Sequence, residues 1–160
     1  MCADGRVGHV HGACLQSPFK LAVVGNDSSG AFACLYNSES NEWGNVISME
    51  ASLINSSRPG ILVGDAFFWL LWEGGILKFD LQMQSLVVID QPVNAHFTFC
   101  HSFPSNFQIL RREGGSVGHA IVSEHNIQLW ERKPNHEAVV TWTLWKTIKM
   151  SEWREYLHRY

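Results

Sequence analysis

Residues 60–91 constrain the fold more than any other stretch, because they hold short apolar runs separated by turn residues. The stretch reads GILVGDAFFWLLWEGGILKFDLQMQSLVVIDQ. Short runs rich in Val, Ile, Phe and Trp, bounded by turn residues, are typical of strands. Gly74 and Gly75 can supply the positive φ angles of a tight turn. The sequence therefore predicts an antiparallel meander in which residues 66–72 pair with residues 76–81, which then pair with residues 86–90.

The same rhythm recurs on both sides of this stretch. Three pairs of an aromatic and a polar residue each follow an apolar run and a turn: Tyr36-Asn37, Phe79-Asp80 and Trp130-Glu131. An apolar residue follows the aromatic one seven positions later at Trp43 and Leu86, and twelve positions later at Trp142. Repeats of about 40–50 residues with four strands each are typical of β-propeller blades. We expect an all-β fold of about three antiparallel, four-stranded, kelch-like blades of a partial β-propeller, with a β-sandwich as the alternative.

The ends of the chain differ from this central part. We interpret residues 1–18 as an N-terminal linker, residues 19–150 as the partial propeller, and residues 151–160 as a short C-terminal helix. In the last segment Trp153, Tyr156, Leu157 and Tyr160 fall at helical spacing, and Ser151 is a suitable N-cap.

Composition narrows the class of protein. The 160 residues carry a formal net charge of −3, far from the basic footprint of a nucleic-acid binder. No run of eighteen apolar residues predicts a membrane span, and the first residues do not resemble a signal peptide. We therefore expect an intracellular protein, cytoplasmic or nuclear, that binds neither nucleic acid nor membrane. Its cysteines, Cys2, Cys14, Cys34 and Cys100, are expected to be reduced thiols.

No motif in the sequence predicts catalysis or a bound cofactor. His9, His11 and Cys14 form an H-x-H-x-x-C arrangement, but a zinc site needs further ligands, and only the distant Cys100-His101 pair offers them. Nucleophile elbows and phosphate-binding glycine loops are absent, and the glycine-rich residues 114–118 fit a wide hairpin turn better. Asp80 and Asp90 are interpreted as turn caps. We expect no metal, no cofactor and no enzymatic activity.

The tryptophans are interpreted mainly as core residues. Trp43, Trp69, Trp130 and Trp142 are expected to pack between neighbouring blades. Strict alternation fails along residues 141–146, which indicates either that Trp142 or Trp145 is partly exposed or that a bulge interrupts the strand.

Several stretches together resemble the C-terminal β-propeller of plant F-box proteins, particularly those expanded in grasses. They are SPFKLAVVG (17–25), AFACLYNSESNEWGNVIS (31–48), ILVGDAFFWLL (61–71), ILKFDLQMQSLVVI (76–89), FQILRREGGSVGHAIVSEHNIQLWERK (107–133) and WTLWKTIKM (142–150). HVHGACLQSPFK (9–20) is similar to the linker that precedes the first blade in that family.

The resemblance implies a substrate adaptor of a Skp–cullin–F-box ubiquitin ligase, whose propeller presents loops to the protein to be degraded. In that family an F-box, a helical motif beginning with Leu-Pro, docks on the Skp-type subunit. These 160 residues contain no such segment, so we expect a protein-interaction module for an unknown target, with Skp binding only if an upstream F-box exists. Two alternatives stay open: a lectin-like or small-ligand domain using Trp72 or Trp145, and a non-functional gene fragment.

Rim loops between strands are the expected binding surface, because recognition residues concentrate on loops held by a rigid scaffold. The predicted loops are residues 26–30, 73–75, 111–115 and 124–126, which we expect to lie on one face. Their candidate residues are Asn26, Asp27, Glu73, Arg111, Arg112, Glu124 and His125.

Overall fold

The computed structural model describes residues 17–92, 106–123, 126–134 and 139–150. Regular structure in these ranges consists of strands and one 3₁₀ turn, η3 (Glu113–Gly115). The strands are β1 (Lys20–Asp27), β2 (Gly30–Asn37), β3 (Glu42–Trp43), β4 (Ile47–Met49), β5 (Ile61–Val63), β6 (Ala66–Leu70), β7 (Ile76–Asp80), β8 (Ser85–Ile89), β9 (Phe107–Arg111), β10 (Val117–Val122), β11 (Asn126–Pro134) and β12 (Val140–Lys149).

These strands form three antiparallel four-stranded sheets, which confirms the predicted all-β class. In the first sheet β1 lies on one edge of β2, while β3 and β4 follow each other along its other edge. The second sheet is the meander β5-β6-β7-β8 and the third is the meander β9-β10-β11-β12. A two-sheet sandwich, the alternative from sequence, does not describe this arrangement.

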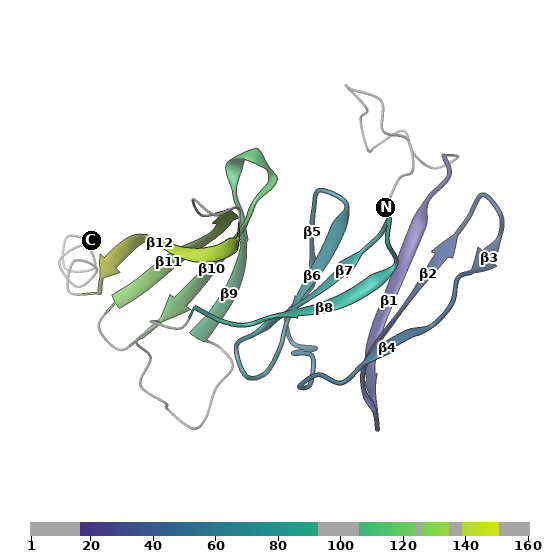
Figure 1. Cartoon of the computed structure of the whole chain (residues 1–160), viewed down its shortest axis with the longest axis horizontal. Helices are drawn as coiled ribbons and strands as arrows, with labels where there is room; N and C mark the ends of the chain where they lie inside the picture. The colour runs from purple at the N-terminus through teal and green to yellow at the C-terminus, as the bar shows by residue number, and fades with distance from the viewer. Residues whose placement is uncertain (1–16, 93–105, 124–125, 135–138, 151–160) are drawn as a thin grey trace, which may run out of the picture.

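The three sheets stand face to face in a series, with the second between the other two (Figure 1). Where the sheets meet, β9 lies against β5 and β6, and β4 lies against β8. The order along the chain is therefore also the order in space.

The predicted repeat is present in part in the strand register. Tyr36, Phe79 and Trp130 lie on strands β2, β7 and β11, each of which lies between the preceding and the following strand, but the described part of the first sheet has no counterpart of β5 or β9. Each is paired with a residue of the preceding strand and a residue of the following one. These triplets are Leu21–Tyr36–Trp43, Phe67–Phe79–Leu86 and His119–Trp130–Leu144.

The three aromatic residues also define equivalent faces. We call the face that carries Tyr36, Phe79 or Trp130 the front face of its sheet, and the opposite one the back face. Phe79, which is fully buried, lies in a cluster with Ala31, Ala33 and Leu35 from the back face of the first sheet. The front face of the second sheet therefore packs on the back face of the first.

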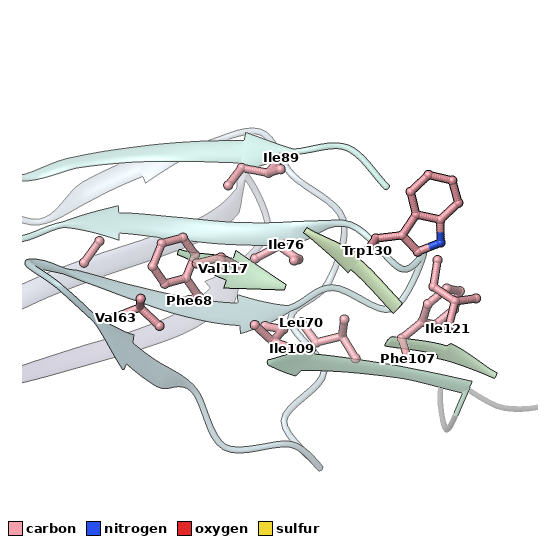
Figure 2. Packing of buried hydrophobic residues seen from close by; sticks show 11 residues of the cluster. Val63, Phe68, Leu70, Ile76, Ile89, Phe107, Ile109, Val117, Ile121 and Trp130 are labelled. Atoms are coloured by element: carbon pink, nitrogen blue, oxygen red, sulfur yellow. The ribbon is translucent and has the colours of Figure 1, made fainter. Parts of the chain in front are cut away.

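The next pair of sheets packs in the same way (Figure 2). Side chains from the back face of the second sheet meet side chains from the front face of the third. The second sheet contributes Val63, Ala66, Phe68, Leu70, Ile76 and Ile89, and the third contributes Phe107, Ile109, Val117, Ile121 and Trp130. The middle sheet is thus covered on both faces, which explains why residues 66–71 read as one apolar run and not as an alternating strand.

One expectation about tryptophans is confirmed and one is corrected. Trp145 is 51% exposed and a register shift between Leu129 and Trp130 interrupts the ladder, as predicted for residues 141–146, while Trp142 pairs with Arg132 and Trp130 pairs with Leu144. Trp43 was expected in the core but is 55% exposed, because it lies on the front face of the first sheet. Trp69 and Trp130 are buried as predicted, and Trp142 packs against the core.

The predicted linker, residues 1–18, and the predicted helix, residues 151–160, lie almost wholly outside the described residues.

Candidate functional site

Turns between strands place the predicted loops on two opposite rims of the molecule. The β1–β2 turn with Asn26 and Asp27 and the β6–β7 turn with Glu73 lie at one rim, at the lower edge of Figure 1. We call this the binding rim. The β10–β11 turn is equivalent to them in strand order, but Glu124 and His125 lie outside the described residues.

Arg111 and Arg112 lie elsewhere, which corrects the prediction that all four loops share one face. They belong to the β9–β10 turn, and successive turns of an antiparallel meander alternate between its two ends. The equivalent turn in the second sheet is β5–β6, at the rim opposite Asn26 and Glu73.

A cleft of about 510 Å³ opens at the binding rim between the first and second sheets. One wall is the end of β1, and the other is β6 with the residues that follow it. The connection between β4 and β5 forms the floor. The lining residues are Val24, Gly25, Asn26, Leu53, Ile54, Ser56, Arg58, Pro59, Gly60, Trp69 and Trp72.

Backbone hydrogen bonds fix the connection that forms the floor. The Ile54 amide donates to Asn26 Oδ1 at 2.9 Å, the Trp72 amide donates to the Leu53 carbonyl at 2.9 Å, and the Asn55 amide donates to the Leu70 carbonyl at 2.8 Å. Asn55 is 1% exposed, and its side-chain oxygen accepts from the Ser57 amide. Because the segment is bonded to both sheets, its side chains are held in place relative to the two walls.

Gly60 brings the chain against the indole of Trp69. A Cβ built at this position would lie 2.2 Å from Trp69 Nε1, so no larger residue fits without displacing the ring. Trp69 in turn stacks on Phe67, with ring centroids 5.4 Å apart. The back of the cleft is therefore a rigid aromatic wall.

The mouth of the cleft presents apolar side chains to solvent. Trp72 is 45% exposed and Leu53 is 59% exposed. Arg58 is the only charged residue of the lining, and it also reaches the third sheet, where Nη1 donates to Gln108 Oε1 at 3.3 Å. This lining contains no carboxylate, imidazole or thiol, so the cleft offers stacking, apolar contact and hydrogen bonds to a bound group.

The tight β6–β7 turn beside the cleft is the one predicted from the sequence. Gly74 has φ +87°, and the Leu71 amide donates to the Gly75 carbonyl at 2.8 Å. A Cβ on Gly74 would lie 2.7 Å from the ring of Phe107 in β9. The turn therefore needs glycine both for its conformation and for its contact with the third sheet.

On the other rim, Arg112 lies in a small cluster with Ser116, Glu131 and Trp145. Its guanidinium lies 3.8 Å from the centroid of the Trp145 ring, and its Nε lies 4.0 Å from Glu131 Oε1. Glu131 also accepts a hydrogen bond from Ser116 at 3.0 Å. Arg112 and the 51% exposed Trp145 thus contact each other on the back face of the third sheet.

The carboxylates considered from sequence stand apart from the cleft. Asp80 caps the β7–β8 turn as predicted, because its Oδ1 accepts from the Gln82 and Met83 amides and its Oδ2 accepts from Lys78 Nζ. The Met83 amide and then Lys78 lower the pKa of Asp80 below its ordinary value. Asp90 contributes its backbone carbonyl, which accepts from Trp142 Nε1 at 2.6 Å.

Candidate metal ligands and thiols are largely untested by the structure. His9, His11, Cys14, Cys100 and His101 lie outside the described residues, and within the described ranges no three His, Cys, Asp or Glu side chains cluster. Cys34 is a free, buried thiol that donates to the Gly44 carbonyl at 3.3 Å.

The sequence identified the two turns that flank the cleft but missed its floor. Residues 51–60 have no strand periodicity, and their only signal is the cluster of turn-forming residues NSSRPG at 55–60. Within the described ranges, no helix combines the length and the apolar character that crossing a membrane requires. Comparison with protein-family models, with curated proteins and with solved structures found no match.

Proposed function

We propose that this chain is a non-enzymatic protein-interaction module whose three sheets are blades of a partial β-propeller. Support comes from the serial packing, in which each front face covers the back face of the preceding sheet at equivalent positions. The resemblance to F-box-associated propellers leads us to propose further that the target is the substrate of a ubiquitin ligase.

The observation that carries the proposal is the cleft at the binding rim. Ligand sites in proteins are typically concave and mainly apolar, with a few polar groups that fix orientation. This cleft has that composition, with Trp72 and Leu53 exposed at the mouth and Asn26, Ser56 and Arg58 among the lining. Tryptophan and arginine are also the residues that most often dominate protein interfaces.

The shape and chemistry of the cleft favour a peptide segment or loop of a partner protein. An apolar side chain of the partner would stack on Trp72, and its backbone would bond to polar groups of the lining. Since the walls belong to two sheets bonded to one floor segment, little ordering is needed on the side of this protein.

Selection from a displayed peptide library tests this function without a known target. The chain should enrich peptides with a shared apolar anchor, and Trp72→Ala should weaken their binding by at least about 2 kcal/mol, the loss typical of a hot-spot residue. Trp145→Ala is the matched control, because Trp145 is similarly exposed but lies at the opposite rim. Equal loss of binding in both variants, or none in Trp72→Ala, would refute the assignment of the cleft.

A sugar is the second candidate ligand, because Trp72 lies exposed within the cleft and aromatic rings commonly stack on small ligands. A glycan array probed with the same two variants separates this alternative from the first. Binding to glycans that depends on Trp72, without enrichment of peptides, would favour the lectin-like function. A chain that binds neither would fit the third alternative, a non-functional fragment.

Ligase docking is proposed to need an F-box outside these 160 residues. A pull-down with a Skp-type subunit should therefore fail with this chain and succeed when a family F-box is fused upstream of it.

A further inference from the structure

The first sheet presents an uncharged, apolar front face over most of its length. Leu21 and Val23 on β1 are 48% and 39% exposed, Phe19 just before β1 is 46% exposed, and Trp43 on β3 is 55% exposed. Among the described residues, the charged group on this face is Asp27, at the end of β1. Contiguous apolar surface of this kind marks an interaction site.

This face is also ordered by contacts between its own aromatic rings. Tyr36 lies between Phe19 and Trp43, with ring centroids 6.0 Å and 5.2 Å away. Phe32 covers Gly25, where a Cβ would lie 2.6 Å from the ring. The side chains are therefore held in place before any partner arrives, which lowers the cost of association.

Equivalent positions show what kind of surface fits such a face. Leu21, Phe67 and His119 occupy the same place in the three sheets, and the last two are covered by the back face of the preceding sheet. A back face made of apolar, mostly aliphatic, side chains therefore receives each of these two front faces. Only the front face of the first sheet has no such cover among the described residues.

The third sheet carries an apolar strip on its back face, beside the Arg112–Glu131 pair and Lys146, which pairs with Leu129. Ala120 is equivalent to Ala22, and Leu129 is equivalent to Leu35, which receives the second sheet. Ile127 and Val122 continue this apolar strip, and all lie opposite the side chains that face the second sheet. The front face of the first sheet and the back face of the third sheet are thus the two kinds of face that already pack together twice inside one chain.

We propose that two copies of this chain associate head to tail, so that the front face of each first sheet packs on the back face of the other copy's third sheet. Two copies provide six sheets, within the four to eight blades of closed propellers, and a head-to-tail contact that closes gives a ring and not a filament. The inference rests on the packing of the sheets and is independent of the proposed ligand.

The area available is adequate for a stable dimer. Eight residues of β1 at about 3.3 Å each, across three strands about 4.8 Å apart, give a footprint of about 370 Å². Two contacts cover four such faces, about 1,500 Å² in total, which lies within the usual range for specific interfaces.

Sedimentation equilibrium of the purified chain tests the proposal. The wild-type protein should have twice the 18.1 kDa mass of one chain, and Leu21→Lys should raise the dimer dissociation constant at least about tenfold. Val87→Lys is the matched control, because Val87 is also 48% exposed and also lies on a strand, but in the second sheet. Circular dichroism melts establish that each variant is folded.

A mixing experiment tests the head-to-tail geometry. Leu129→Lys damages the other surface, so this variant alone should also dimerise at least about tenfold more weakly than the wild type. An equimolar mixture of Leu21→Lys and Leu129→Lys should regain dimers, since one of the two contacts then joins two intact faces. A monomeric wild type would overturn the proposal, and so would a dimer insensitive to Leu21→Lys. A dimer lost in Leu21→Lys but kept in Leu129→Lys would instead indicate contact between two first sheets.

Discussion

Lowering the pH should destabilise this protein through one buried histidine. His119 is fully buried between the second and third sheets, where it stacks on Phe107 at 5.6 Å and lies 5.7 Å from Trp142. Within the described part of the chain, neither ring nitrogen has a hydrogen-bond partner. Burial lowers the pKa of His119 from 6.5 to about 4, because an imidazolium ion in this apolar site would lose its hydration without gaining a counter-charge.

The sign and size of the effect follow from proton linkage. Between pH 6.5 and pH 4 the unfolded chain binds a proton at His119 while the folded chain does not, so the free energy of unfolding falls as the pH falls. A difference between pKa values of 6.5 and about 4 corresponds to about 3 kcal/mol lost by pH 4. Below pH 4 the folded state also binds the proton, and this contribution levels off.

Urea denaturation of the wild type and of His119→Leu between pH 8 and pH 4 measures this loss. Leucine is similar in volume and leaves no partner unpaired, so the variant should be at least as stable as the wild type at pH 8 and should lose about 3 kcal/mol less on acidification. Contributions from carboxylates cancel in the comparison, and Asp27 and Asp80, whose pKa values are lowered below 3.8, titrate at lower pH. Parallel pH profiles for the two proteins would refute the reasoning.

Three further substitutions test the packing and the turns by chemical denaturation. Gly60→Ala should lower the free energy of unfolding by about 1–3 kcal/mol and shift the fluorescence of Trp69, because the new Cβ overlaps the indole. Gly75→Ala is the control and should change stability little, because its Cβ would meet no atom closer than 3.4 Å. A larger loss of stability in Gly75→Ala than in Gly60→Ala would contradict the packing. Phe79→Ala should cost about 3–5 kcal/mol and Phe79→Leu clearly less, since the ring is fully buried; equal small losses would argue against a core position. Asp80→Ala should cost about 1 kcal/mol by removing the acceptor of two turn amides, and an unchanged midpoint would show that the cap contributes nothing.

Much of the fold could be predicted because strand patterns are local. Short apolar runs and turn residues located the meander at residues 60–91, and the spacing of seven residues predicted the pairs Tyr36–Trp43 and Phe79–Leu86 that the ladders contain. The third pair failed because the ladder of β11 and β12 places Trp130 opposite Leu144 and Trp142 opposite Arg132, and the register across a longer loop cannot be read from local patterns. Local patterns therefore predicted the elements better than the pairing across a longer loop.

Properties that depend on how sheets meet could not be predicted. Trp43 lies at an equivalent position to the half-buried Leu86, yet it is exposed because no described sheet covers its face. The cleft needs the end of β1, the segment 51–60 and Trp72 together, and these are brought together only by the packing of two sheets. Arg111 and Arg112 were predicted at the wrong rim because successive turns of an antiparallel meander lie at alternate ends of it, and their turn is the first of its meander.

Hydrogen exchange tests most directly the central claim that three sheets pack in series with the middle one covered on both sides. Amides of β6 and β7, which lie inside the second sheet, should exchange most slowly, while those of β1 and β12 at sheet edges should exchange fastest among the strands. We expect this order at the level of proteolytic peptides covering residues 66–81. Protection that is equal in all three sheets, or greatest in β1 or β12, would contradict it.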